Sequence, residues 1–285
     1  MRVPEPWGRR PWELATRTVR KFLDDDMTTY AAALAFHMLL ALVPFVIFLL
    51  SFLGALGLPD FFDRLRGQVQ AALPDDTFRG LVRVVGEVRE RTGGGLISFG
   101  LLFAFWSASA GVRSLMHAFN IIYGVAESRP ARKLYPLSLL YTIGLVALLI
   151  AAVSLMLVGP GTVRWLAGYF GLAEVVVGLW TWLRWPAAAL LLLLTIDVVY
   201  YVAPTIPLPF RLITPGSILA VAAWVVAAVG FSAYVSTFGS YGATYGSLGG
   251  AIVLLLYFFI SGLALLLGAE VNAILYRDGV VSRES

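Results

Sequence analysis

The sequence predicts an all-helical polytopic membrane protein, with six transmembrane helices and an amphipathic helical pair between spans one and two. Its 285 residues are 59% hydrophobic and 13% charged, which is outside the range of soluble globular domains. A hydrocarbon core of about 30 Å needs roughly 20 helical residues, and in lipid the backbone must satisfy its own hydrogen bonds. Six apolar stretches meet that length: Thr28 to Leu58, Leu96 to Ile122, Pro136 to Val158, Gly178 to Val202, Pro215 to Phe238 and Leu248 to Tyr276.

The N-terminal segment, residues 1–27, is predicted to contain a short helix lying on the inner membrane surface. Apolar residues such as Trp12 and Val19 alternate there with arginines and acids, as in interfacial helices. No short apolar core with a cleavage site is present, so we expect no cleaved signal peptide. Asp24 to Asp26 are predicted to cap the first span, and Pro44 to kink it.

The connection between spans one and two, residues 59–95, is the largest polar excursion. Apolar residues recur at helical spacing on either side of Pro74, so the segment is predicted to form an extracytoplasmic helical pair. It would be either a lid over a cavity or a packed interfacial helix pair.

Spans four to six are delimited by shorter signals. Val163 to Val177 is apolar but short, which favours an interfacial or re-entrant helix. Thr214 and Pro215 are predicted to be the N-cap and first helical residue of span five. The glycine-rich run Gly239 to Gly250 is predicted to be a tight outer turn before span six. A cytoplasmic tail, residues 277–285, is expected after it.

The distribution of basic residues predicts that both termini are cytoplasmic. Arginine and lysine precede span one, lie between spans two and three, and follow span six, and basic residues favour the cytoplasmic side. The connection between spans one and two carries six arginines and disagrees. We still place it outside, because the other connections agree.

Ionisable residues inside the predicted spans are the candidates for function. Arg113, Asp197 and Glu270 lie in spans two, four and six. A charge at a helix centre costs about 2.5–3.5 kcal/mol, so such residues normally face the protein interior and have a partner. His117 and Asn120 share the helical face of Arg113. We hypothesise a cluster of these five residues, in which Arg113 pairs with Glu270 or Asp197.

Two interpretations of this cluster remain open. In the functional one, the Arg113 guanidinium binds an anionic headgroup, because it matches phosphate and carboxylate geometry. In the structural one, the charges form a buried network that fixes helix register. His117 and His37 taken alone are more typical of hydrogen-bonded interior residues than of a proton relay.

Other kinds of chemistry find no support in the sequence. The chain has no cysteine, which excludes disulfides and thiolate metal sites, and its two histidines are far apart. The glycine-rich run lacks the lysine and strand context of a phosphate loop. No catalytic constellation or basic nucleic-acid stripe is visible. We therefore expect no metal, no cofactor, no catalytic residues and no nucleic-acid partner.

Three sequence blocks resemble the YihY/BrkB membrane family. They are Thr29 to Phe36 with Leu42-Val43-Pro44, Ser107 to Asn120 continuing to Arg129, and Tyr245 to Gly250 through Leu267 to Ala273. The resemblance implies a bacterial inner-membrane protein with six spans and both termini cytoplasmic. The family was once labelled ribonuclease BN, and this sequence gives that label no support, so an enzyme is not expected. Family names mention virulence, and some relatives are suspected of moving lipids.

The leading hypothesis is a transporter or flippase-like protein that handles an amphiphilic, anionic envelope molecule such as a lipid. Pro44 and Gly246 would act as hinges, and membrane lipids would be its partners. The alternative is a non-transporting scaffold that binds envelope proteins. The sequence leaves the oligomeric state open, because small-residue helix faces serve internal packing and dimerisation equally well.

Overall fold

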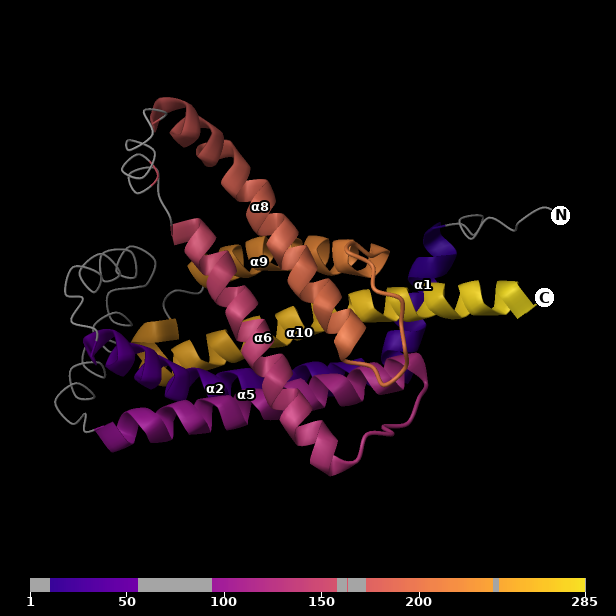
Figure 1. The fold of residues 1–285 in the computed structure, drawn as a ribbon, viewed down its shortest axis with the longest axis horizontal. Helices are drawn as coiled ribbons and strands as arrows, with labels where there is room; N and C mark the ends of the chain where they lie inside the picture. Colours follow the sequence, from indigo (N-terminus) through magenta and orange to yellow (C-terminus); the bar gives the residue numbers. More distant parts are fainter. Residues whose placement is uncertain (1–10, 56–93, 158–162, 164–172, 238–240, 285) are drawn as a thin grey trace. The chain divides into compact units, whose positions relative to one another are not determined.

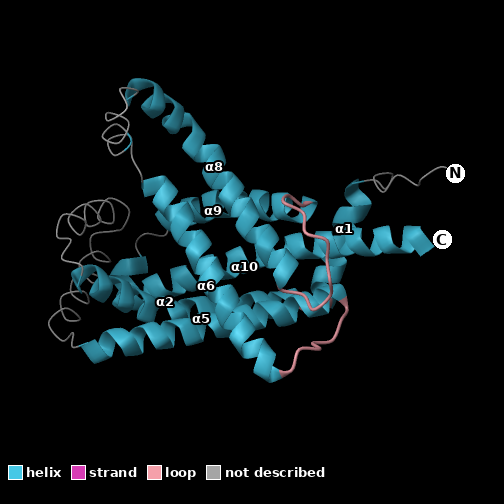
Figure 2. Ribbon diagram, in the orientation of Figure 1, coloured by secondary structure: helices cyan, strands magenta, loops and turns pink. Residues whose placement is uncertain are grey.

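All regular structure in the described part of the chain is helical, as the sequence predicts (Figure 2). The computed structural model describes residues 11–55, 94–157, 163, 173–237 and 241–284. The helices follow in the order α1 Pro11–Asp24, α2 Met27–Ala55, α5 Gly94–Tyr123, α6 Ala131–Leu157, α8 Ala173–Val202, α9 Pro215–Thr237 and α10 Tyr241–Glu284 (Figure 1).

Four of the described helices contain segments long and apolar enough to cross a membrane. They are Ala131–Ala152, Val176–Val202, Pro215–Val235 and Gly249–Gly279, and they coincide with predicted spans three to six. Helices α2 and α5 have 29 and 30 residues, and their assignment as spans one and two stays a prediction. The predicted extracytoplasmic pair falls almost entirely outside the described residues.

The chain divides into two compact units. The first contains residues 1–27, 116–223 and 264–285, and the second contains residues 28–115 and 224–263. Helices α5, α9 and α10 each contribute to both units. In the first unit α6 and α8 lie side by side (Figure 1). Its core contains the fully buried side chains of Phe119, Ile122 and Leu266.

The second unit is held by close contacts between small residues. Ala31 and Ala35 of α2 are buried, and Gly262 of α10 faces Ala31 so closely that an added Cβ would lie 3.3 Å from the Ala31 backbone. Gly111 of α5 similarly faces His37 of α2, since a Cβ added at Gly111 would lie 3.2 Å from the Cβ of His37. Small residues let membrane helices approach each other, so these contacts define the α2–α5 and α2–α10 interfaces.

The structure changes three predicted boundaries. Helix α8 begins at Ala173, so the end of the stretch Val163 to Val177 belongs to span four rather than to a separate helix. Helix α10 begins at Tyr241, so the predicted turn through Gly250 is wrong from that residue onward. Glycine weakens a helix by only about 1 kcal/mol, which the long apolar continuation compensates. The same helix continues through the expected tail to Glu284.

The predicted start of span five is confirmed in the structure, and the capping of span one by Asp24 to Asp26 stays a prediction. Helix α9 begins at Pro215 with Thr214 as its cap: the Ser217 N–H donates to Thr214 Oγ1 at 3.2 Å, and the Thr214 N–H donates to Ser217 Oγ at 3.1 Å. This reciprocal pair is a capping box. Helix α2 follows Asp26, whose φ of 53° ends α1 in the left-handed region that aspartate tolerates.

Candidate functional site

Buried polar residues of the first unit form the centre of the candidate site. Asn120, Asp197 and Glu270 are 1%, 2% and 0% exposed, although each lies on a predominantly apolar helix. A buried polar group is costly unless it is hydrogen-bonded, so the partners of each residue decide what it can do.

Asp197 belongs to a chain of hydrogen bonds that joins three helices. Thr214 Oγ1 donates to Asp197 Oδ1 at 2.6 Å, and Asn272 Nδ2 donates to Thr214 Oγ1 at 2.9 Å. The Gly216 N–H then donates to Asn272 Oδ1 at 2.9 Å. The cap of α9 is thereby tied to α8 and α10. The second oxygen of Asp197 is buried and accepts no hydrogen bond from a described residue.

Two glycines bring the backbones of α9 and α10 into contact beside this chain. A Cβ added at Gly216 would lie 2.1 Å from the Gly268 carbonyl oxygen, and one added at Gly268 would lie 2.3 Å from the Gly216 carbonyl oxygen. Tyr200 of α8 reaches the same point, where its hydroxyl donates to the Leu265 carbonyl at 2.7 Å. This crossing of α9 and α10 at Gly216 and Gly268, together with the Tyr200 hydrogen bond, fixes α8, α9 and α10 relative to one another.

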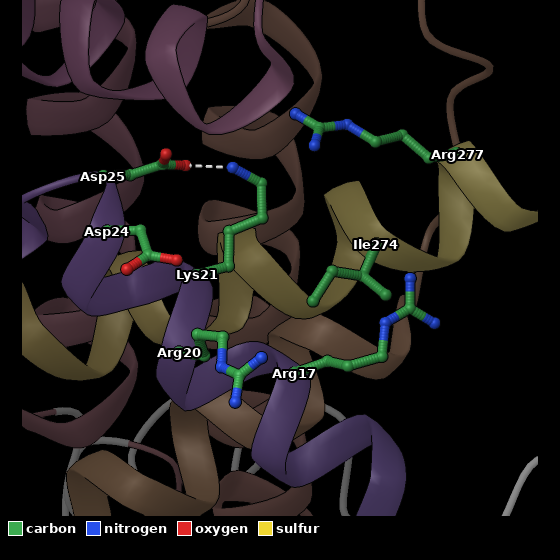
Figure 3. A pocket seen from close by; sticks show the side chains of 7 residues that line it. All are labelled: Arg17, Arg20, Lys21, Asp24, Asp25, Ile274 and Arg277. Carbon is green, nitrogen blue, oxygen red and sulfur yellow. Dashed lines mark hydrogen bonds and ion pairs between the residues drawn. The ribbon is translucent and has the colours of Figure 1, made fainter.

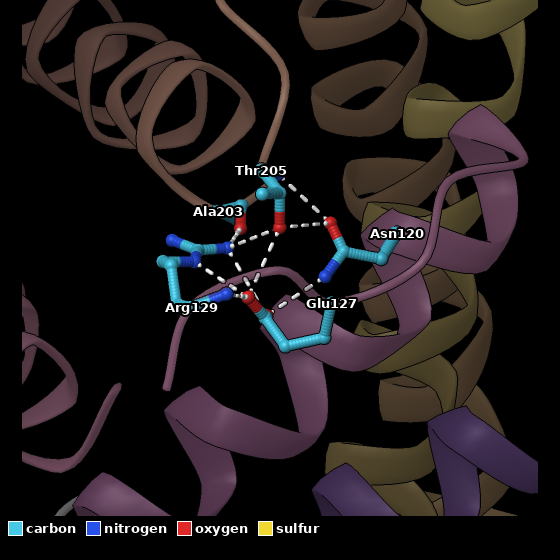
Figure 4. A network of polar contacts seen from close by, with 5 residues as sticks. All are labelled: Asn120, Glu127, Arg129, Ala203 and Thr205. Atoms are coloured by element: carbon cyan, nitrogen blue, oxygen red, sulfur yellow. Dashed lines mark hydrogen bonds and ion pairs between the residues drawn. The ribbon is translucent and has the colours of Figure 1, made fainter. Parts of the chain in front are cut away.

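Asn120 belongs to a second network, which ties together the loops after α5 and α8 (Figure 4). Its Nδ2 donates to Glu127 Oε2 at 2.8 Å, and its Oδ1 accepts from the Thr205 N–H at 2.8 Å. Arg129 Nε donates to Glu127 Oε1 at 2.9 Å, and Arg129 Nη2 donates to the Ala203 carbonyl at 2.8 Å. Burial raises the pKa of Glu127, but the hydrogen bonds and charge of Arg129 outweigh it and hold the pKa below its ordinary value.

Helix α5 ends at this network with a glycine cap. Gly124 has a φ of 68°, and its N–H donates to the Ile121 carbonyl while the Val125 N–H donates to the Asn120 carbonyl. This is a Schellman motif. Arg277 of α10 completes the cap, because its Nη2 donates to the Ile122 carbonyl at 2.6 Å.

Glu270 lies beside the junction of α1 and α10. It is fully buried, and neither of its carboxylate oxygens accepts a hydrogen bond from a described donor. Lys21, Asp25 and Arg277 lie within electrostatic reach of it.

A pocket of about 420 Å³, lined mainly by charged side chains, opens between α1 and α10 (Figure 3). Lys21 and Asp25 form an ion pair at its wall, and Arg17 pairs with Asp278 at 3.1 Å. Four basic and two acidic side chains line it together with one apolar one: Arg17, Arg20, Lys21, Asp24, Asp25, Ile274 and Arg277.

Arg113 belongs to the second unit. Its Nη1 donates to Ser109 Oγ at 2.9 Å, and its guanidinium carbon lies 5.7 Å from the centre of the Trp106 ring. Both contacts lie toward the N-terminus of its own helix, the direction in which helical side chains lean. His37 is within electrostatic reach of Arg113, and its Nδ1 is buried without a described hydrogen-bond partner.

The five predicted site residues therefore have different surroundings. Asn120, Asp197 and Glu270 lie in the first unit, each with different neighbours. His117 lies there too, but its side chain is exposed, so its predicted interior position is wrong. Since Arg113 lies in the second unit, its pairing with Glu270 or Asp197 stays a prediction.

Sequence reasoning missed the residues that surround the buried acids. Thr205 and Asn272 are ordinary polar residues whose roles depend on distant parts of the chain. Lys21 and Asp25 had a detectable signal, since oppositely charged residues at i and i+4 on a helix face each other.

Comparison with known proteins assigns the chain to a family. Residues 18–284 match the family described as virulence factor BrkB. The chain belongs to this family. The match confirms the resemblance found in the three sequence blocks, and it covers every described residue of the buried polar networks.

Relatives of this BrkB-family chain include proteins with two kinds of name. The ribonuclease-like protein YfkH of Bacillus subtilis is 34% identical over 247 residues, which cover 87% of this chain and 89% of that protein. The UPF0761 membrane protein Smlt0865 of Stenotrophomonas maltophilia is 29% identical over 265 residues, covering 89% of this chain and 58% of that protein. The UPF0761 names carry no enzymatic term. No solved structure matches the chain.

Proposed function

We propose that this protein is a transporter or flippase-like protein of the bacterial inner membrane, with six spans and cytoplasmic termini, that handles an amphiphilic anionic envelope molecule such as a lipid. The observation that carries the proposal is the burial of Asp197 and Glu270 on apolar helices. Both carboxylate oxygens of Glu270 and one of Asp197 accept no hydrogen bond from a described residue. Ionisable groups at membrane depth mark substrate and ion pathways by default.

Arg113 is the residue that would recognise the headgroup. Its guanidinium donates to Ser109 Oγ and lies near Trp106, and its planar fork of N–H groups matches the geometry of a phosphate or carboxylate. Asp197 would provide the balancing negative charge, and Glu270 would add to it when it is ionised. Pro44 inside α2 and Gly246 inside α10 are the positions where these helices would bend.

The first test is lipid mass spectrometry on protein extracted with its surrounding bilayer. The wild type is expected to enrich one anionic lipid or lipid precursor, and Arg113→Ala is expected to lose about tenfold of that enrichment. A tenfold loss corresponds to 1.4 kcal/mol, close to the low end for a hydrogen bond to a charged group. Arg132→Ala, which removes an exposed arginine at the start of α6, should leave the enrichment unchanged.

Translocation of fluorescent anionic lipid by the same variants in proteoliposomes then separates binding from transport. Enrichment without translocation would favour the alternative of a non-transporting scaffold that binds lipid. A lipid profile identical to the bulk membrane in all three proteins would remove the support for a headgroup site.

A further inference from the structure

Glu270 is a buried acid whose surroundings do not suit a permanent negative charge. It is completely buried on α10, and no described N–H or O–H group donates to either oxygen. An ionised carboxylate without hydrogen bonds is very costly to bury, and such a group normally becomes neutral by holding a proton.

The charged and titratable groups around Glu270 come from three elements. Lys21 lies in the last turn of α1, and Asp25 directly follows that helix. Arg277 lies about two turns after Glu270 on the same face of α10, and Tyr123 is the last residue of α5. Lys21 is ion-paired with Asp25, and its positive charge lies within reach of Glu270 as well. Two carboxyl groups that share a site do not both ionise readily. Glu270 is the acid of the pair that holds the proton, because neither of its buried oxygens has a hydrogen-bond partner among the described residues.

The pocket between α1 and α10 gives this carboxyl pair a route to water. Asp25, Lys21 and Arg277 all line the pocket, and the Asp25 side chain is 17% exposed (Figure 3). Glu270 itself does not line it. A proton from pocket water would thus reach Glu270 through the Asp25 carboxyl, which belongs to both the pocket wall and the surroundings of the buried acid.

We propose that Asp25 and Glu270 form a proton-binding site, loaded and unloaded through the pocket, and that proton exchange at this site drives transport. The statement that proton exchange drives transport rests on the proposed function. A proton passes from water to Asp25 and from Asp25 to Glu270, and its release by the reverse route leaves one additional negative charge on the pair.

Release of the proton has a defined structural consequence. The new charge on Glu270 attracts Arg277, whose guanidinium holds the Ile122 carbonyl at the C-terminus of α5. The acid and the helix end then compete for one arginine. Loss of the Arg277 bond would free the end of α5, the helix that carries Arg113, so the protonation state can bias a helix of the proposed transport path.

Infrared spectroscopy of the protein in lipid nanodiscs tests the proton site directly. Wild type is expected to show the carbonyl stretching band of a protonated carboxylic acid that disappears as the pH is raised. Glu270→Gln should remove this band, and Asp25→Asn should shift its titration midpoint by about one pH unit or more. Asp24→Asn, which changes the adjacent acid of the pocket wall, should leave the band in place. A band that persists in Glu270→Gln would overturn the proposal.

Thermal unfolding provides a second readout that does not depend on the band. Glutamine resembles a protonated glutamate, so Glu270→Gln should change the unfolding midpoint at neutral pH by less than about 3 °C, the shift expected from roughly 1 kcal/mol in a protein of this size. A decrease of 10 °C or more, roughly what loss of a buried ion pair would cause, would show that Glu270 is ionised and would contradict the site.

Lipid translocation under an imposed pH gradient separates this inference from the proposed function. Dependence of the wild-type rate on the gradient, lost in Glu270→Gln, would support both. If the wild type shows the infrared band but moves no lipid, the proposed function fails while the proton site stands. If lipid moves at the same rate with and without the gradient, and in Glu270→Gln, proton coupling fails while transport stands.

Discussion

The close approach of Gly216 and Gly268 depends on the absence of two side chains. Each glycine faces the carbonyl oxygen of the other, so a methyl group at either position would overlap a backbone atom that cannot rotate away. Tyr200 and Ala220 also lie within 3 Å of a Cβ added at Gly268. These positions therefore demand glycine for packing rather than for backbone conformation.

We expect Gly268→Ala to destabilise the protein by about 1–3 kcal/mol, the usual cost of overpacking a close contact. Gly250→Ala on the same helix is the matched control, because nothing lies within 4 Å of a Cβ added there. The control should be neutral or slightly stabilising, since alanine is the better helix former. Unfolding curves in detergent would measure both, and equal stability of the two variants would contradict the observed crossing.

At the scale of elements, the Glu127 network joins the loop after α5 to the loop after α8. Its carboxylate accepts hydrogen bonds from Asn120, Arg129 and Thr205. These bonds favour the charged form and lower the pKa of Glu127 in the folded protein. A lowered pKa means that the network contributes stability above the unfolded-state pKa of 4.5 and loses it as the pH falls through the folded value.

We expect Glu127→Gln to destabilise the protein at pH 7 by about 1–3 kcal/mol, the range for hydrogen bonds to a charged group. The difference from wild type should shrink as the pH falls from about 4.5 through the lower pKa of the folded state, because the wild-type acid becomes protonated over that range. Unfolding midpoints recorded between pH 7 and pH 3 would check this. Glu13→Gln, the same change on an α1 acid outside the network, should show no such convergence, and a constant difference for Glu127→Gln would contradict the assigned charge.

The whole molecule offers a direct test of its membrane topology, because it contains no cysteine. Single cysteines introduced at Thr16 and Ser282 are expected to react with a membrane-impermeant maleimide only after the cells are permeabilised, since the basic flanks predict that both termini are inside. Gln70→Cys, in the predicted extracytoplasmic segment, should react in intact cells. Labelling of the two termini from opposite sides would rule out six spans.

Most of the fold could be predicted from the sequence, since the helical class and spans three to six follow from apolar length. The helix starts at Ala173 and Tyr241 were missed for one reason, which is that a short segment was interpreted without its neighbour. The short apolar segment was predicted to be a separate helix, and the glycine-rich segment was predicted to be a turn. A neighbouring long apolar segment lets the helix extend through them. Asn120, Asp197 and Glu270 were also recognised as buried from their apolar surroundings.

The sequence by itself determined that this is a helical membrane protein of the BrkB family with ionisable residues at membrane depth, because apolar length and buried charge are local properties. The tertiary structure decided which groups those residues meet. Asp25 and Glu270 lie near opposite ends of the chain, and Gly216 and Gly268 come from different helices. A buried acid can be satisfied by many different partners, so its chemistry depends on folding rather than on sequence spacing.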